Sequence, residues 1–150
     1  MQRRRIQAQS RRSERGTALA ELAIGALVFF IAVFGILELG RLLWTHNALT
    51  DAARRGARYA SMNSQNTTKV KNLVVYGNAN GGTQPVVYNL TTNNVSVTYS
   101  GFGVKQGTVT VQITGYQFVL NVPLIGATIT LPAYKTTLMG ESAGYVPATI

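Results

Sequence analysis

The sequence predicts an α+β protein in which a long N-terminal transmembrane helix continues into a protruding helix that packs on a small, mainly antiparallel β-sheet domain. Three observations on the 150 residues predict it. A basic segment opens the chain, an apolar run follows it and ends at Leu37, and after residue 60 polar and apolar residues alternate in a segment rich in Asn, Thr, Gly and Val. We therefore divide the chain into a basic leader (1–16), a transmembrane span (17–37), a protruding helix (38–60) and a β-rich outer domain (61–150).

The leader carries most of the charge. It holds six arginines and one glutamate, which is more than half of the formal net charge of +9. A strongly basic chain often binds nucleic acid. Here the basic residues flank an apolar run instead of lining a folded face, so we expect no nucleic-acid partner.

The span has Glu21 as its only charged residue. Its 21 residues extend over about 31 Å as a helix, close to the hydrocarbon thickness of a bilayer. A removable secretory signal is the alternative, but the apolar run is too long for one and no small-residue cleavage site follows Leu37. More arginines precede the span than follow it, which favours a cytoplasmic N-terminus, and Trp44 suits the water–lipid boundary beyond it.

The helix is expected to continue to Ala60, because residues 38–60 lack proline and are rich in good helix formers. Small and apolar residues recur there at three- and four-residue spacing: Leu49, Ala52, Ala53, Gly56 and Ala60. The opposite side carries Asp51, Arg54, Arg55 and Arg58. Ion pairs are expected between Glu38 and Arg41, and between Asp51 and Arg54 or Arg55. The small-residue side is predicted to pack on the chain's own domain.

In the outer domain, alternation predicts strands at 95–99 and 108–114. After Gly115 the alternation continues one residue out of phase through Tyr116, Phe118, Leu120 and Val122, which predicts a β-bulge or sharp bend at the glycine. Weaker strand candidates are 70–76, 86–90 and 128–131. Hairpin turns are expected at 81–82 and 101–103.

The outer domain offers little for catalysis. Residues 59–150 contain no His, Cys or Asp and a single Glu, Glu141, so acid–base chemistry and metal binding lack the groups they need. His46 is expected to be structural. A Ser–Lys pair with Lys69, Lys71, Lys105 or Lys135 is formally possible, but nothing positions one. We expect no enzyme, no cofactor, no metal and no small-molecule substrate.

The start of the span resembles a type IV prepilin processing site, in which a peptidase cuts after a glycine and a glutamate lies at the fifth residue beyond it: Gly16-Thr17-Ala18-Leu19-Ala20-Glu21. Two further motifs follow on the helix. One is E-x-G-R at Glu38, Gly40 and Arg41, and the other is A-x-x-G-A-R-x-A with Ala53, Gly56, Ala57 and Arg58. Together, over about residues 11–60, they resemble the TadE-like family, pseudopilins of the tight-adherence (Flp-type) pilus.

The resemblance implies a pilin-like fold and a minor pilin-like, non-enzymatic subunit of a tight-adherence type IV-like pilus, held in the bacterial inner membrane. Prepilin peptidase would trim it between Gly16 and Thr17, and Glu21 would pair with the new N-terminal amine of a neighbouring subunit. Expected partners are this peptidase, other pilin-like subunits, the pilus assembly platform and membrane lipid. The alternative is an untrimmed, single-pass anchored binding module outside the cytoplasm, whose Arg41 and Arg54–Arg58 touch anionic headgroups.

Overall fold

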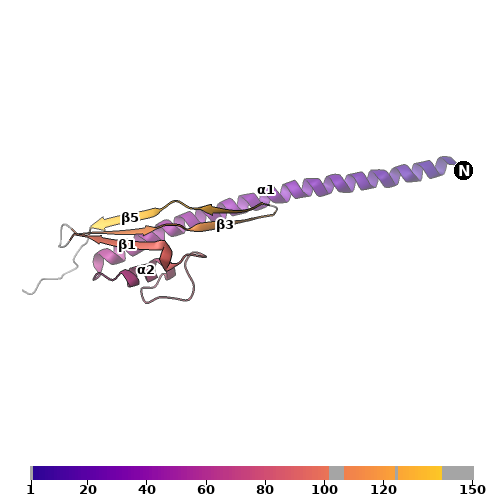
Figure 1. Cartoon of the computed structure of the whole chain (residues 1–150). Coiled ribbons are helices and arrows are strands. Elements are labelled where there is room, and N and C mark those ends of the chain that lie inside the picture. The colour runs from indigo at the N-terminus through magenta and orange to yellow at the C-terminus, as the bar shows by residue number, and fades with distance from the viewer. Residues whose placement is uncertain (1, 102–106, 124, 140–150) are drawn as a thin grey trace, which may run out of the picture.

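The computed structural model describes residues 2–101, 107–123 and 125–139, with side chains from Gly16 onward except that of Ile125. In chain order its elements are α1 (Gln2–Met62), α2 (Thr67–Tyr76), the 3-10 turn η1 (Thr92–Asn94), β1 (Val95–Ser100), β2 (Thr108–Ile113), β3 (Gln117–Val122), β4 (Ile125–Thr130) and β5 (Tyr134–Met139). The C-terminal half of α1 lies along the strands and α2, and its N-terminal half extends away from them (Figure 1). The predicted fold class is confirmed.

Helix α1 is one uninterrupted helix of 61 residues, longer at both ends than the sequence predicted. Its beginning at Gln2 is consistent with the Arg, Gln and Ala of the leader, which are good helix formers. It ends at Met62, where the backbone N–H and the side-chain amide of Asn63 both donate to the carbonyl of Tyr59, at 3.1 and 2.9 Å. Those bonds satisfy a carbonyl that the end of the helix would otherwise leave unpaired.

The strand predicted at 70–76 is wrong, because these residues form α2. The Asn66 side chain caps the helix by accepting the backbone N–H of Lys69 at 3.0 Å. Gly77, at φ +70°, closes it by donating its N–H to the carbonyl of Leu73 at 2.9 Å. A run of β-branched residues suggested a strand, but Val70 and Val74 are spaced to share one face of a helix and both are buried.

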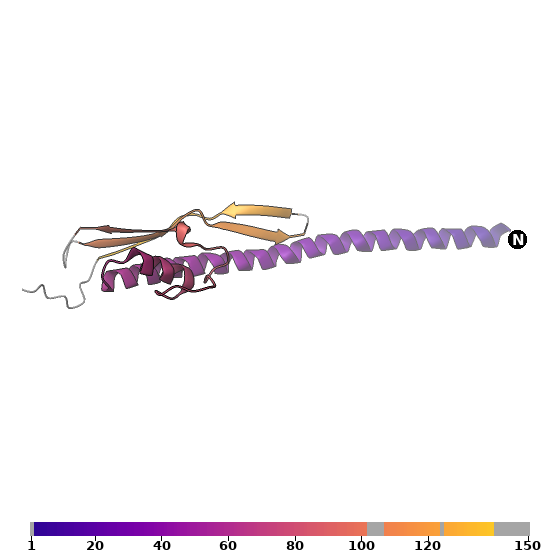
Figure 2. The same ribbon diagram turned by 60° about the horizontal axis from the view of Figure 1, so that its bottom comes forward.

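The strands form two antiparallel sheets where the sequence predicted one. β1, β2 and β5 make the first, in the order β1-β2-β5, and β3 pairs with β4 in the second. The two sheets follow one another along α1 (Figure 2). The predicted strands at 95–99, 108–114 and 128–131 are confirmed within one to three residues at their ends, and β5 was not predicted.

Gly115 marks the change of sheet. Its φ of +67° lies in the left-handed region that favours glycine. The predicted change of phase is confirmed, since Tyr116 and Phe118 are both buried. The bend takes the chain out of the first sheet and into the second, instead of continuing one strand with a bulge.

Two local predictions fail in the segment between α2 and η1. Residues 86–90 form no strand, although Val86 donates its N–H to the carbonyl of Val75 at 2.7 Å and so holds this segment against α2. Gly81 has a φ of +96° but lies in this loop and not in a hairpin. β1 and β2, which flank the turn predicted at 101–103, are paired with each other. Gly101 follows the end of β1, and residues 102–106 lie outside the described part of the chain, so the turn stays a prediction.

The core forms where α1, α2 and the first sheet meet. The predicted small-residue side of α1 is buried, and its charged side is exposed, as the sequence indicated. The most completely buried larger side chains are Leu49, Val70, Val74, Val75, Val87, Val95, Val109, Val111 and Ile113. A single hydrophobic core therefore fixes the outer half of α1 to its own domain.

Candidate functional site

The N-terminal half of α1 is an exposed apolar surface. Most of its large side chains are 40 to 70% exposed: Leu19, Leu22, Ile24, Leu27, Val28, Phe29, Phe30, Phe34, Ile36 and Leu37. Among the described residues, the helix from Gly16 is long and apolar enough to cross a membrane, and none of its most apolar stretch is buried in the fold. A surface this large and apolar needs lipid or other protein to cover it.

The predicted processing residues lie at the beginning of this surface. Gly16, Thr17 and Glu21 are all exposed on the uninterrupted helix. A methyl group added at Gly16 would meet no neighbouring atom within 4 Å. The site is therefore accessible in the single chain, and cleavage after Gly16 stays a prediction.

The E-x-G-R motif lies where α1 meets the second sheet. The predicted ion pair is present, with 2.8 Å between an Arg41 Nη and Glu38 Oε2. The Glu38 side chain is only 11% exposed, against 41% for Arg41, so the arginine shields a nearly buried carboxylate. The buried Oε2 has this charged partner but no hydrogen-bond donor among the described residues. Gly40, between them, is exposed and has no neighbour within 4 Å of a Cβ position.

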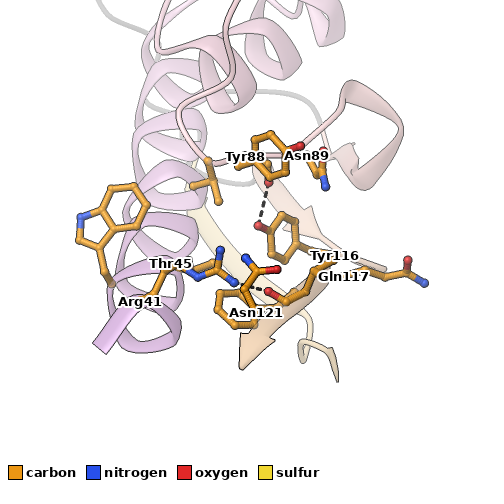
Figure 3. Close-up of a pocket in the computed structure, with 11 residues that line it drawn as sticks. Arg41, Thr45, Tyr88, Asn89, Tyr116, Gln117 and Asn121 are labelled. Carbon is orange, nitrogen blue, oxygen red and sulfur yellow. Dashed lines mark hydrogen bonds between the residues drawn. The ribbon is translucent and has the colours of Figure 1, made fainter. Parts of the chain in front are cut away.

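Arg41 also holds β3. Its guanidinium lies over the ring of Phe118, 4.5 Å from the centroid, and donates to the carbonyl of Val119 (Figure 3). A guanidinium can make both contacts at once because it is planar and carries several donors. The sequence singled out Glu38 and Arg41 but did not identify these partners on β3, which lie almost 80 positions further along the chain. Only the apolar alternation at 116–122 indicated that Phe118 faces inward.

The second motif packs α1 against α2 and β2. Ala53, Ala57 and Ala60 are buried, and Gly56 lies directly beneath Val74. A Cβ at residue 56 would overlap a methyl group of Val74 and would also touch Val111 and Val70. Arg58 lies on the exposed side of α1. Within one chain, therefore, the small residues of this motif build the core.

Substitution of Gly56 by alanine is expected to lower the free energy of unfolding of the full chain in detergent by about 1–3 kcal/mol, because the added methyl group overpacks the contact with Val74. Urea denaturation followed by the tyrosine signal of the outer domain measures it. Gly40→Ala is the matched control, since a Cβ there meets nothing; it is expected to leave stability unchanged or slightly raised. Equal effects of the two substitutions would contradict the packing role of Gly56.

An open pocket of about 530 Å³ lies beside Arg41, between α1, the segment at 87–89 and β3 (Figure 3). Aromatic and amide side chains dominate its lining, which consists of Arg41, Trp44, Thr45, Val87, Tyr88, Asn89, Tyr116, Gln117, Phe118, Val119 and Asn121. The Tyr116 hydroxyl donates to the carbonyl of Tyr88 at 2.8 Å. Burial raises the pKa of Tyr116, and the nearby Arg41 charge lowers it by less, so this hydroxyl stays protonated at neutral pH and keeps its bond. None of these lining residues carries a carboxylate.

His46 has the structural role that was expected. Its Nδ1 lies 3.0 Å from the Tyr134 hydroxyl, and the two rings meet edge to face, so the pair fastens β5 to α1. Burial raises the pKa of Tyr134, which keeps that hydroxyl protonated at neutral pH. In the described part of the chain, no group of three or more His, Asp and Glu residues is placed to hold a metal ion. Lys105, one of the lysines considered for a Ser–Lys pair, lies outside the described residues.

The apolar span, the start of the span at Gly16–Glu21 and the two helix motifs are therefore arranged along one helix. No curated protein and no solved structure is significantly similar to the chain. A family model does match it, that of the TadE-like proteins, over residues 16–58, a range that contains the first motif and the second as far as Arg58. Over these residues the chain is therefore similar to the pilus-associated TadE-like family, which confirms the resemblance that its sequence motifs predict.

Proposed function

We propose that the protein is a minor pilin-like structural subunit of a tight-adherence type IV-like pilus. In this proposal α1 holds it in the bacterial inner membrane with its N-terminus in the cytoplasm, prepilin peptidase trims it after Gly16, and it then associates through α1 with other pilin-like subunits at the assembly platform. The observation that carries the proposal is the division of α1 into two halves. Residues 16–37 expose most of their apolar side chains, while the small-residue side of residues 49–60 is built into the core.

That division suits a subunit that moves from lipid into a filament. An apolar helix can exchange lipid for the helices of neighbouring subunits at little cost, because both surroundings are apolar. The leader's arginines would oppose this movement, since drawing guanidinium groups through hydrocarbon is expensive. Trimming would remove all six of them.

Gly16 suits the cleavage position on physical grounds. A glycine within a helix costs about 1 kcal/mol relative to alanine, which makes local opening of α1 easier at this residue. The side of Gly16 on which a Cβ would lie is also open, since no described atom lies within 4 Å of that position. The new amine at Thr17 would then be a cation within the apolar bundle, where the carboxylate of Glu21 on another subunit can neutralise it.

The proposal is tested by the N-terminus of the membrane-bound protein. We expect intact-mass and N-terminal analysis to give a chain that begins at Thr17 in cells with the peptidase and at Met1 in cells without it. Gly16→Leu should leave Met1 in both, whereas Gly25→Leu, at an equally open glycine of α1, should still be trimmed. An intact Met1 in cells with the peptidase would overturn trimming and favour the untrimmed anchored module.

A further inference from the structure

The pocket beside Arg41 has a buried floor and an exposed rim. Four of its lining residues are buried and form the floor: Thr45, Val87, Tyr116 and Phe118. All the other lining residues are exposed and form the rim. The volume of about 530 Å³ falls within the range of about 300–1,000 Å³ that is typical of small-ligand sites. The pocket is therefore large enough for a small ligand.

Two aromatic side chains of the rim contribute little to the core. Tyr88 is 79% exposed and Trp44 is 59% exposed. The backbone of Tyr88 is nevertheless held in place, because the N–H of Leu90 donates to the carbonyl of Val87 at 3.0 Å and both of these residues are buried. The hydroxyl of Tyr116 holds the Tyr88 carbonyl as well. An exposed ring on a fixed turn is preorganised to pack against a ligand.

The rim also carries side-chain amides without a hydrogen-bond partner. Within the described part of the chain, neither the Asn89 nor the Asn121 amide takes part in a hydrogen bond. Each amide offers two donors and an acceptor oxygen. In Figure 3, Tyr88 and Asn89 lie at one end of the pocket and Asn121 lies at the other, with Tyr116 between them. A ligand in the pocket would therefore meet unpaired amides at both ends.

The free edge of the β3–β4 hairpin adds backbone groups to the same pocket. The N–H of Leu131 donates to the carbonyl of Tyr116 at 2.9 Å, so these two residues form a hydrogen-bonded pair. Because such pairs alternate along an antiparallel ladder, the backbone groups of residues 117, 119 and 121, which all line the pocket, point away from β4. The carbonyl of Val119 already accepts from Arg41. An added β-strand would therefore meet Arg41 in the middle of this edge, whereas a smaller ligand can bond at 117 and 121.

The pocket offers no uncompensated charge. Arg41 is the charged residue among those that line it, and an oxygen of Glu38 lies 2.8 Å from its guanidinium. Neither an anion nor a cation is therefore favoured as the ligand. Exposed aromatic rings and neutral amides together suit a sugar ring, because its C–H face packs on an aromatic ring and its hydroxyls both donate and accept hydrogen bonds.

We propose that the pocket beside Arg41 binds a neutral pyranose sugar, which packs against Tyr88 and Trp44 and bonds through its hydroxyls to Asn89 and Asn121. The sugar can belong to a free glycan or to the headgroup of a membrane lipid, since Trp44 lies only about 10 Å along α1 beyond the end of the span at Leu37. The proposal does not depend on trimming after Gly16 or on pilus assembly. Its failure leaves the cleavage experiment standing, and the reverse also holds.

Trp44 is the single tryptophan and lines the pocket, so its emission reports binding without a label. The full chain in dodecylphosphocholine, a detergent without a sugar headgroup, would be titrated with N,N′-diacetylchitobiose, maltose and lactose. Sorbitol is the control ligand, because it has the hydroxyls of a hexose but no ring. We expect a saturable change of Trp44 emission with a disaccharide and none with sorbitol. In a second arm, the chain is placed in phosphatidylethanolamine–phosphatidylglycerol vesicles with and without monoglucosyl diacylglycerol.

Variants connect the response to the pocket. Tyr88→Ala and Asn121→Ala are each expected to weaken sugar binding about tenfold, through loss of the aromatic contact and of the amide bonds respectively. Tyr88→Phe keeps the ring and should bind as the wild type does. Asn80→Ala, at an exposed asparagine outside the pocket lining, is the matched control and should also bind normally. All three substituted residues are exposed, so the variants should keep the fold, which circular dichroism checks.

The two arms separate the sources of the sugar. A response to a disaccharide would support a free glycan, and a response to the glycolipid vesicles alone would support a lipid headgroup. The proposal would be overturned by the absence of a response in both arms, by an equal response to sorbitol, or by unchanged binding in both Tyr88→Ala and Asn121→Ala. Binding of an extended Thr–Val repeat peptide in place of any sugar would also overturn it and would indicate strand addition at β3.

Discussion

Replacement of Glu21 by alanine is expected to leave trimming after Gly16 intact and to reduce pilus output severely. A carboxylate in the middle of a membrane costs about 2.5–3.5 kcal/mol by insertion scales and less near the surface. Glu21 is exposed in the single chain, so its carboxylate is open to a partner on another subunit of the proposed filament. If trimming occurs after Gly16 as proposed, the amine that it would create at Thr17 carries the positive charge that such a partner needs.

The experiment compares three variants by two measurements, the mass of the mature chain and the amount of sheared pilus. Glu21→Ala and Glu21→Gln should both be trimmed and both assemble poorly, because neither carries a negative charge. Glu21→Asp should recover part of the output, since it keeps the charge on a side chain one methylene shorter. Unchanged output from Glu21→Ala would refute the charge pairing, and loss of trimming would move the role of Glu21 to recognition by the peptidase.

The elements that residue type and spacing determine could be predicted from the sequence. The apolar span, the small-residue side of α1 and the strands around Val97 and Val111 all follow from residue type at fixed spacing. Helix α2 was mistaken for a strand because its valines are β-branched, and its caps at Asn66 and Gly77 outweighed that preference. The cap residues were visible in the sequence, so this error was avoidable.

The division into two sheets was not predictable in the same way. Alternation predicts that β3 has an inner face but does not say which strand pairs with it or which part of α1 it covers. Strand pairing and the position of each strand along α1 depend on contacts between residues far apart in the chain, such as Arg41 with Val119 and His46 with Tyr134. The sequence motifs therefore identified the residues of the site that lie on α1. Phe118, Val119 and the pocket beside them were identified only from the structure.

Arg41 is the residue of the E-x-G-R motif whose loss should have the larger effect on stability. It neutralises the nearly buried Glu38 and fastens β3 through Phe118 and Val119. Breaking a fully buried ion pair costs about 3–5 kcal/mol, because the remaining charge is left without a partner. Arg41 is partly exposed, so we expect Arg41→Met to lower the free energy of unfolding by about 1–3 kcal/mol, measured by denaturation of the full chain in detergent.

Arg41→Met should also destabilise one part of the structure more than the rest. Amide hydrogen exchange is expected to accelerate in β3 and β4 and to change little in β1 and β2, since Arg41 contacts only the second sheet among these strands. Arg55→Met is the matched control, because its ion pair with Asp51 is exposed on both sides and should contribute at most about 0.5 kcal/mol.

The double variant Glu38→Gln/Arg41→Met separates the charge from the packing. Removing both charges leaves no unpaired carboxylate, so the double variant should be more stable than Arg41→Met alone, while it still lacks the contacts to Phe118 and Val119. A double variant as unstable as the sum of the two single variants would mean that Glu38 and Arg41 act independently. In that case the motif would fix the hairpin through the arginine alone, and the carboxylate of Glu38 would need another explanation.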